Sequence, residues 1–394
     1  MINNKKVVGI VVEYDPFHNG HYKQIERAKE ITSAEYVCVI MSGPFMQRGT
    51  MSMFSPYDRA EMAVRNNVDV VLELPTYFSL RDAKGFAFGA IYILHSLGIV
   101  DYISFGCEAP QIDLLWSIAK LLHTQNETVH AYTQTNIGVG KSYVANQSEA
   151  IGYLLGEEAK EIYSHPNNML AIQYLCALLQ LNSPIEVVPI LREGAFHSKE
   201  MNPLEPSASF IRYCILKGNV HQAMRCLPAG SIECIEKILL TRKWNQKQFA
   251  DEGLLIYLKT TAASALVSYP GVSEGLENKI HKHIQKCHSA DTLLQAIKSR
   301  RFTQSRLQRL FSYVSLGITK QDLETHHTPA YTRVLAYKNK ALPLVRALKN
   351  ANINVIMKSK LYENLLLQDK LAYAMWETCA KTDCNFISHK IFHI

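Results

Sequence analysis

Features of exported and membrane-bound proteins are missing from this sequence. No stretch of its 394 residues approaches the roughly 20 consecutive apolar residues that a membrane-spanning helix requires. The apolar run near the amino terminus is interrupted by Glu13 and Asp15, and no small-residue cleavage site follows it, as it would in a signal peptide. We therefore expect a soluble, cytoplasmic protein that has no membrane partner.

Closely spaced cysteines are also missing. The nine cysteines are scattered along the chain, and no two of them form a CxxC motif. This usage argues against a disulfide framework and indicates a reducing compartment. The segment HKHIQKCH brings together His281, His283, Cys287 and His288, but tetrahedral metal sites usually combine two separated ligand pairs. We interpret the segment as a solvated helix face and expect no metal centre.

Low-complexity segments and internal repeats are absent as well. Hydrophobic residues make up 47% of the chain and charged residues 20%, which is typical of a globular protein and excludes a disordered or fibrous one. Single hydrophobic cores stop growing beyond roughly 250–300 residues, so the length predicts two domains.

Acidic residues are scarce in one part of the chain. The formal net charge is only +7, but between Thr292 and Tyr362 only Asp322 and Glu324 oppose the basic side chains. The basic residues of this stretch are Lys298, Arg300, Arg301, Arg306, Arg309, Lys320, Arg333, Lys338, Lys340, Arg346, Lys349, Lys358 and Lys360. Such an uneven field predicts a polyanionic partner, and nucleic acid rather than a membrane because no lipid-facing amphipathic segment accompanies it.

The first ~110 residues alternate short apolar runs with helical patterns, which is typical of a doubly wound parallel α/β sheet. The expected strands are Val7–Val12, Tyr36–Met41, Val68–Leu74 and Tyr102–Phe105. The expected helices are His21–Ile31, one opened by Ser55 and Pro56, and Ala83–Leu97. Ligands of such sheets bind at the carboxyl ends of the strands, so the loops that follow these strands should converge on one crevice.

Helical spacing dominates the rest of the chain. A helix near Ile112–His123, another starting near Asn167, and a strand at Ile185–Leu191 precede a polar loop and a further helix at Ser207. Strand signals fade after about Asn219. We therefore predict a nucleotide-binding catalytic domain over residues 1–218 and a helical, nucleic-acid-binding domain over residues 219–394.

The strongest local signal is GIVVEYDPFHNGH, in which an apolar strand leads through a short turn into a helix. Gly20 would let the backbone approach a triphosphate, and unpaired N–H groups at a helix amino terminus favour anions. His18 and His21 could stabilise the charge that develops on an α-phosphate as pyrophosphate leaves. A histidine pair at a helix start is more often a cap or a surface feature, but its place on the first turn of the sheet favours catalysis.

Other candidates are weaker. In MSGPFMQRGT, after the second strand, Ser42 and Gly43 could form an anion-facing turn, and Arg48 could neutralise a carboxylate or phosphate, although the loop could equally be a solvated surface feature. Gly106 follows a strand, and Asn167 could be a plain helix cap. The remaining candidates, all near strand ends or helix starts, are Arg192, His197, Ser198, Ser207, Ser209 and Arg212.

Several segments follow one another along most of the chain: VVEYDPFHNGH, IMSGPFMQRG, LELP, FGCE, HPNNMLAIQYL, LREGAFHS and PSASFIR, with RRFTQSRLQRL and YTRVLAYKNK as fainter matches. Together they resemble the tRNA(Met) cytidine acetate ligase family, a branch of the HxGH nucleotidyltransferase superfamily. The resemblance implies an enzyme that joins acetate to ATP, releases pyrophosphate, and uses the acetyl-adenylate to acetylate N4 of the wobble cytidine of elongator tRNA(Met). It implies no stable protein partner.

The resemblance also implies residue roles, with His18 and His21 catalytic and magnesium as the usual companion of ATP. The implied ATP-binding residues are Val11, Val12, Glu13, Tyr14, Asp15, Pro16, Phe17, His18, Asn19, Gly20, His21, Tyr22, Lys23, Gln24, Gly106, Asn167 and Arg192. The helical domain would hold the tRNA. The candidate tRNA or substrate contacts are Arg48, Arg300, Arg301, Arg306 and Arg309.

The chain departs from the family pattern at four positions. Asp15 stands where asparagine is usual, Gln24 replaces a histidine, and Pro44 and Met46 alter the loop after the second strand. A carboxylate at Asp15 could repel a triphosphate or help to hold magnesium. Gln24 can still donate hydrogen bonds, but it carries no charge.

Two other functions are compatible with these residues. A nucleotidyltransferase that adenylylates a phosphate-bearing cofactor precursor would share the HxGH segment but would leave the basic half unexplained. A tRNA-binding homologue without catalysis would accommodate the changes at Asp15 and Gln24. The segment Met357-Lys358-Ser359-Lys360 superficially resembles the phosphate-clamping loop of an aminoacyl-tRNA synthetase, but it lies far from the nucleotide-binding part, and we interpret it as coincidence.

Overall fold

The architecture is taken from a computed structural model of the chain. It describes residues 4–108, 111–124, 126–135, 143–192, 206–241, 243–247, 249–357, 364–382 and 390–394. The strands are β1 (Val7–Val12), β2 (Tyr36–Ser42), β3 (Val70–Leu74), β4 (Tyr102–Cys107), β5 (Glu186–Leu191), β6 (Tyr331–Tyr337), β7 (Asn354–Ile356) and β8 (Phe392–His393).

Helices make up most of the remaining described chain. Those up to β5 are α1 (Asn19–Thr32), α2 (Pro56–Arg65), α3 (Thr76–Ser79), α4 (Ala83–Ser96), α5 (Ile112–Thr124), α6 (Asn126–Thr135), α7 (Tyr143–Leu155), α8 (Glu157–Ser164) and α9 (Pro166–Gln180). Those after β5 are α10 (Ala208–Leu216), α11 (Val220–Met224), α12 (Ala229–Thr241), α13 (Asp251–Thr260), α14 (Ala263–Leu266), α15 (Leu276–Ile284), α16 (Ala290–Ile297), α17 (Gln304–Leu316), α18 (Lys320–Thr325), α19 (Leu342–Ala347) and α20 (Leu367–Ala380).

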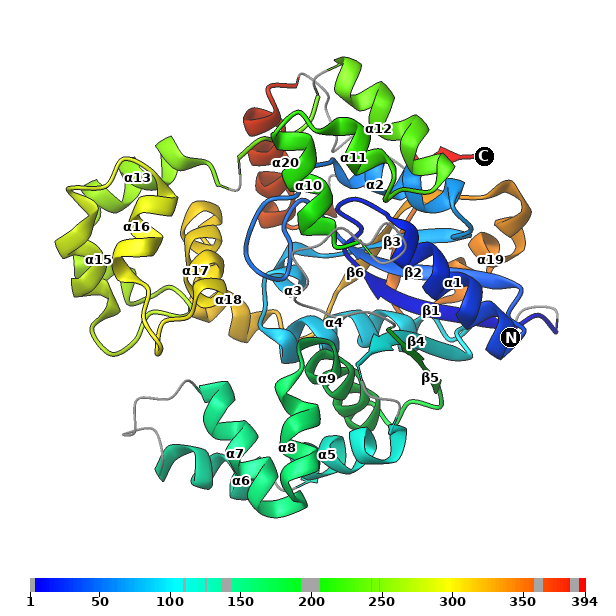
Figure 1. Ribbon diagram of the computed structural model, residues 1–394, viewed down its shortest axis with the longest axis horizontal. Coiled ribbons are helices and arrows are strands. Elements are labelled where there is room, and N and C mark those ends of the chain that lie inside the picture. The colour runs from blue at the N-terminus through cyan, green and yellow to red at the C-terminus, as the bar shows by residue number, and fades with distance from the viewer. Residues whose placement is uncertain are drawn as a thin grey trace.

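A single sheet forms the centre of the molecule, with strand order β5-β4-β1-β2-β3-β6-β7 (Figure 1). The first five strands in this order are parallel, and the order reverses between β1 and β4. Right-handed crossovers place α1 and α2 on one face and α4 and α9 on the other. The predicted doubly wound α/β fold is therefore confirmed, and its switch point lies beside the carboxyl end of β1.

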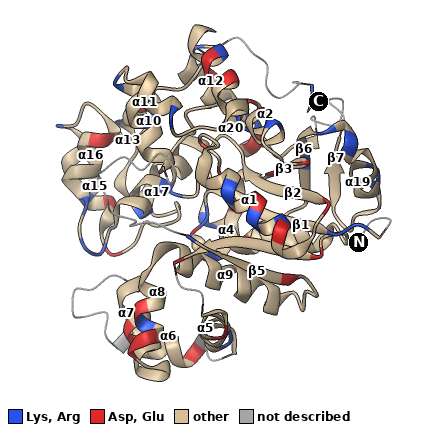
Figure 2. Ribbon diagram, turned by 45° about the vertical axis from the view of Figure 1, so that its right-hand side comes forward, with Lys and Arg blue, Asp and Glu red and all other residues tan. Residues whose placement is uncertain are grey.

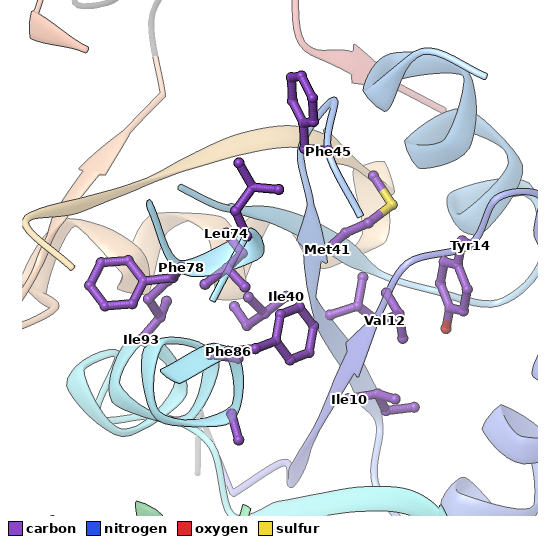
Figure 3. Close-up of a cluster of buried hydrophobic side chains, with 14 of the residues drawn as sticks. Ile10, Val12, Tyr14, Ile40, Met41, Phe45, Leu74, Phe78, Phe86 and Ile93 are labelled. Atoms are coloured by element: carbon purple, nitrogen blue, oxygen red, sulfur yellow. The ribbon is translucent and has the colours of Figure 1, made fainter. Parts of the chain in front are cut away.

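The strands of the sheet are apolar because both faces are covered. Every residue of β2 and β3 is buried, and β1 contains only one partly exposed position. Their side chains pack against α3 and α4, so that Ile40 and Leu74 lie close to Phe78, Phe86 and Ile93 (Figure 3). This core holds the carboxyl ends of the strands in fixed positions beneath the loops that follow them.

The chain returns to the sheet after the helical region. β6 pairs antiparallel with β3, and β7 and β8 pair with β6. The predicted helical carboxyl-terminal region is present from α11 to α18, but strands from beyond residue 219 belong to the same sheet as β1. The division at residues 218 and 219 stays a prediction about folding units.

A lobe formed by α13 to α18 lies to one side of the sheet (Figure 1). Polar contacts attach it near the carboxyl ends of the strands. The Arg81 side chain donates to the carbonyls of Leu323 and His326 at 2.6 Å each, and the Tyr313 hydroxyl donates to the Leu80 carbonyl at 2.6 Å. The lobe therefore has a defined orientation relative to the loops of the nucleotide-binding region.

Two further findings concern the described residues only. None of their helices combines the length and the apolar character that crossing a membrane would require. The cysteines among them are all free, and most are buried. Burial raises the pKa of the Cys38 and Cys234 thiols to about 12, so these thiols stay protonated at neutral pH.

Candidate functional site

His18 and His21 form a closed pair at the start of α1. His18 is the N-cap residue, and its Nδ1 accepts a hydrogen bond from the Gly20 backbone N–H at 3.1 Å. In return, the Nδ1 of His21 accepts from the His18 backbone N–H at 3.3 Å, which completes a capping box. The two rings stack with centroids 3.6 Å apart. The sequence motif is thus both the helix cap and the candidate catalytic pair.

Both imidazoles are neutral at physiological pH. Burial lowers the pKa of His18 to about 3, and the charges of Arg192 and Arg212 act in the same direction. Burial, the neighbouring His18 and Arg192 lower the pKa of His21 well below its ordinary value. Because each Nδ1 accepts a hydrogen bond, the proton of each neutral ring must be on Nε2. The pair therefore offers two N–H donors without carrying a charge.

The amino terminus of α1 differs from the expectation of unpaired backbone N–H groups. The N–H of Asn19 donates to the carbonyl of Cys226 at 3.1 Å, and the N–H of Gly20 is taken by the His18 ring. The backbone donors are therefore already paired, because the histidine cap and the segment after α11 satisfy them. The helix dipole still favours an anion here.

Asp15 has a structural role that explains its burial. It is 4% exposed, and its carboxylate accepts hydrogen bonds from the backbone N–H groups of Met53 and Phe54 at 3.0 and 3.1 Å. The Arg212 side chain donates to the Asp15 carbonyl at 2.5 Å and lies 3.7 Å from its carboxylate. The carboxylate thus faces backbone donors and an arginine, so its charge is compensated within the protein.

Arg59 and Glu13 connect the loops after β1 and β2. Arg59, which is fully buried, donates to the carbonyls of Glu13, Ser42, Gly43 and Phe54. The Glu13 carboxylate accepts from the Gln47 N–H at 2.7 Å. Burial raises the pKa of Glu13, and this hydrogen bond and the nearby arginines oppose the rise.

No motif marks Arg59 in the sequence. The only signal is its position on the otherwise apolar buried face of α2, where Met62 and Ala63 are its neighbours one turn along the helix. A buried guanidinium needs several acceptors, and here backbone carbonyls supply them. Arg59 therefore fixes the two loops that carry the strongest sequence motifs.

Gly106, Asn167 and Arg192 meet on the other side of the switch point. A Cβ on Gly106 would lie 3.1 Å from the Arg192 side chain, and that guanidinium donates to the Asn167 side-chain oxygen at 3.4 Å. Glu108 caps α9 by accepting from Asn167 and Asn168. Because Arg192 also acts on the pKa of both histidines, this group lies beside the start of α1.

The other residues of the predicted ATP segment have mixed environments. Val12 and Tyr14 lie in the core (Figure 3), and the Tyr14 ring contacts the rings of Phe17 and His21 with centroids 4.7 Å away. Tyr22 accepts from the Asn67 amide at 3.4 Å. The remaining members of the segment are Val11, Pro16 and Gln24, which are buried or partly buried, and Lys23, which is exposed.

The loop with Arg48 joins the site to the helical lobe. Arg48 is exposed and its charge acts on Glu13, whereas Gly49 is buried against α17. Gly49 has a φ of 87°, and a Cβ there would lie 2.2 Å from the backbone nitrogen of Arg309. The Ser312 hydroxyl donates to the Gly49 carbonyl at 2.8 Å. The structure thus brings Arg48 and Arg309 onto adjacent segments.

Several residues of the predicted basic stretch are occupied within the protein. Arg306 donates to the Gly271 carbonyl and the Ser273 hydroxyl, and Arg301 pairs with Glu274 at 2.7 Å. Arg300 is exposed. The prediction that Arg333 belongs to a nucleic-acid footprint is wrong, because this side chain is 1% exposed and paired with Glu73.

Some candidates fall outside the described residues or have local roles. His197, Ser198, Lys358 and Lys360 lie outside the described ranges. Ser207 caps α10 through the Phe210 N–H, and the Ser209 hydroxyl accepts from Arg212 at 3.4 Å.

The HKHIQKCH segment covers the last turn of α15 and the residues that follow it. Its Cys287 is buried, and the thiol donates to the His283 carbonyl at 3.3 Å. Among the residues that the structure describes, no three His, Cys, Asp or Glu side chains cluster as metal ligands would. His281 and His288 are exposed, as a solvated helix face would have them, and Ile284 and Cys287 pack inward.

The buried histidine cap predicts a dependence of stability on pH. The unfolded chain takes up a proton on His18 below pH 6.5, while the folded protein does so only near pH 3, so acid favours unfolding. Asparagine is also a good N-cap and does not titrate. Between pH 7 and pH 5, wild-type protein should therefore lose up to about 2 kcal/mol more unfolding free energy than His18→Asn. Urea midpoints at both pH values measure this, and equal losses would contradict it.

A family model and several known proteins match this chain over most of its length. The chain matches a family model described as HIGH Nucleotidyl Transferase over residues 5–389. The tRNA(Met) cytidine acetate ligase of Clostridium botulinum (strain Okra / Type B1) is 36% identical over 376 residues, which cover 92% of this chain and 91% of the relative. That of Clostridium kluyveri (strain ATCC 8527) is 34% identical over 368 residues and covers 90% of each chain.

Solved structures of TmcAL have the same fold as this chain. Apo TmcAL of Thermotoga maritima matches with a TM-score of 0.90 and 28% identity, covering 99% of both chains. The same protein bound with alpha-thio ATP matches with a TM-score of 0.83 and 29% identity, covering 94% of this chain and 91% of the other. A neighbour with this fold therefore binds an ATP analogue.

Proposed function

Because this chain belongs to the tRNA(Met) cytidine acetate ligases, which are ATP-using, tRNA-modifying enzymes of the HIGH nucleotidyl transferase family, we propose that it works in two steps. It first converts acetate and ATP into acetyl-adenylate. It then acetylates N4 of the wobble cytidine of elongator tRNA(Met). The enzyme would work in the cytoplasm and need no stable protein partner. The observation that carries the proposal is the neutral pair of His18 and His21 beside Arg192 and Arg212 at the switch point of the sheet.

This arrangement suits adenylate formation. Arg192 and Arg212 bring positive charge to the start of α1, where the triphosphate would lie with its α-phosphate near the histidines. An acetate oxygen attacks the α-phosphorus, the bond to the bridging oxygen breaks, and pyrophosphate leaves with the electron pair. The Nε2–H groups of His18 and His21 donate to the phosphate oxygens, on which negative charge increases. Neutral rings suit this role because they need no proton transfer.

The second step transfers the acetyl group. The N4 amine of cytidine attacks the carbonyl carbon of acetyl-adenylate, the carbon–oxygen bond to the phosphate breaks, and AMP leaves, while the amine releases one proton. The cytidine must be unpaired and turned out of its loop for this attack, as is usual in sequence-specific RNA recognition. Sheltering of the adenylate from water before the amine arrives would prevent its hydrolysis.

Magnesium would accompany ATP rather than occupy a protein cage. Asp15, for which repulsion of a triphosphate and help with magnesium were both considered, accepts from two backbone N–H groups. Among the described residues no carboxylate cluster lies at the site, so phosphate oxygens and water would supply most magnesium ligands.

A single incubation tests the proposed function. The protein, ATP, carboxyl-labelled acetate and bulk tRNA are combined, and the RNA is then digested to nucleosides. We expect a labelled acetylcytidine and stoichiometric AMP and pyrophosphate. Omission of tRNA should leave acetate-dependent exchange of pyrophosphate into ATP intact. Stimulation of exchange by phosphomonoesters instead of carboxylic acids would favour the cofactor-adenylylating alternative, and RNA binding without any ATP turnover would favour the non-catalytic one.

A further inference from the structure

The helix α10 presents an unusual solvent-facing surface. Tyr213 is 57% exposed and Leu216 is 50% exposed. Ser209 and Lys217 lie one turn to either side of Tyr213, so these four side chains share one helix face. The opposite face is buried through Ile211, Cys214 and Ile215, which explains why the helix is stable despite its exposed apolar groups.

Hydrogen bonds join the region of α10 to residues on either side of His18. The residue before Tyr213, Arg212, donates to the Asp15 carbonyl at 2.5 Å. The segment after α11 approaches α1, because Asn19 donates to the carbonyls of Cys226 and Arg225 at 3.1 and 3.5 Å. Since α10 and α11 pack together, α10 lies near the amino terminus of α1 (Figure 1).

The segment that carries the face has charge of one sign. Residues 206–232 contain no Asp or Glu (Figure 2). Lys217 and Arg225 are exposed, and Arg212 is partly exposed. An aromatic ring with cations around it, and without carboxylates, suits a single-stranded nucleic acid, whose bases stack on the ring while its phosphates meet the cations.

The other exposed aromatic residues of the described ranges lack this combination. Tyr153 on α7 is 75% exposed, but its ring stacks on Tyr132 with centroids 5.4 Å apart. The neighbouring α8 carries Glu157, Glu158 and Glu161, so that surface would repel phosphates. Tyr257 on α13 is held by Tyr269 through a hydrogen bond of 2.7 Å.

We propose that the exposed face of α10, composed of Ser209, Tyr213, Leu216 and Lys217, binds the unpaired nucleotides of the RNA anticodon loop, with a base stacked on Tyr213. The inference rests on the proposed function, since it takes the RNA to be the acetyl acceptor. It places part of the RNA contact on the nucleotide-binding side of the molecule rather than only on the helical lobe. Stacking of a neighbouring base would help to hold the reacting cytidine out of its loop.

Tyr213→Ala tests the stacking. We expect the KM for tRNA to rise roughly 10- to 100-fold, since a stacked base contributes that much to binding. Acetate-dependent pyrophosphate exchange, which involves no RNA, should keep its rate. Tyr213→Phe, which retains the ring, should restore the KM. An unchanged KM in Tyr213→Ala, or an equal loss of the exchange reaction, would overturn the proposal.

Two further measurements separate this proposal from the proposed function. Tyr153→Ala is the matched control and should leave the KM for tRNA unchanged. Lys217→Ala should weaken binding of an anticodon stem-loop RNA and reduce its salt slope by about 1, because one phosphate contact is lost. If wild-type protein acetylates no RNA, the proposed function fails. The α10 surface would still be supported by weaker stem-loop binding in Tyr213→Ala and overturned by equal binding.

Discussion

Replacement of His21 by alanine should reduce acetate-dependent pyrophosphate exchange by roughly 10²- to 10³-fold, which is the usual cost of removing one hydrogen-bond donor to a developing oxyanion. The reason is that His21 Nδ1 already accepts from the His18 N–H, so the ring proton is on Nε2, which is the donor that a phosphate oxygen would use. A partly buried, neutral ring held in this way is a fixed donor that needs little reorganisation when charge develops.

A second substitution separates the catalytic role of His21 from its capping role. Glutamine is a usual partner at this position of a capping box, so His21→Gln should keep the helix start and the thermal stability of the wild type. The exchange rate should still fall, since the glutamine amide cannot occupy the position of the imidazole Nε2–H. His123→Ala, an exposed histidine on α5, is the control and should be fully active. Wild-type exchange in His21→Gln would remove the imidazole from the mechanism.

A candidate site could be predicted from the sequence because its central part is local. The strand, the turn and the His18-Asn19-Gly20-His21 helix start are contiguous, and their place on the first turn of a predicted sheet favours a catalytic role. The pairing of Asn19 with Cys226 could not be predicted, because a partner more than a hundred residues away leaves no local pattern. The sequence analysis did consider that the histidine pair could be a helix cap. It did not predict that the His18 ring would occupy the Gly20 N–H, because the sequence does not give the orientation of the ring.

No strand was expected beyond about Asn219, so β6 was missed, and the reason is related. The segment Tyr331–Tyr337 contains Arg333, and a charged residue inside a run of buried positions argues against a strand when its partner is unknown. Its partner is Glu73, on β3, which is distant in the sequence and adjacent in the sheet. A charge that is paired in the folded protein and a charge that is free to bind RNA have the same appearance in the sequence, which is why Arg333 was assigned to the basic footprint.

The buried Glu73–Arg333 pair packs against the turn that follows β2. Arg333 Nε and an Arg333 terminal nitrogen lie 2.7 and 2.6 Å from the Glu73 carboxylate, whose other oxygen accepts from the Tyr373 hydroxyl at 2.6 Å. That same oxygen lies 2.5 Å from the position a Cβ on Gly43 would occupy. The pair therefore packs against the turn that Arg59 also holds, and strands β3 and β6 and helix α20 meet there.

Loss of one partner from this pair should be costly. Arg333→Met removes the cation and leaves Glu73 buried, so we expect a loss of about 3–5 kcal/mol in unfolding free energy, measured by urea denaturation. Arg301→Ala is the control, because its pair with Glu274 is exposed and should contribute about 1 kcal/mol or less.

The pH dependence of the Arg333→Met deficit tests its cause. Burial already raises the pKa of Glu73, and Arg333 is the main charge that opposes this rise. Without Arg333 the folded-state pKa should rise further, so Glu73 becomes protonated in the folded variant as the pH falls, and the buried charge disappears. Since a carboxyl with a raised folded-state pKa favours folding as pH decreases, the deficit should be larger at pH 8 than at pH 5. A deficit that is the same at both values would mean that lost packing of Arg333 on the Tyr373 ring, rather than an unpaired carboxylate, accounts for the destabilisation.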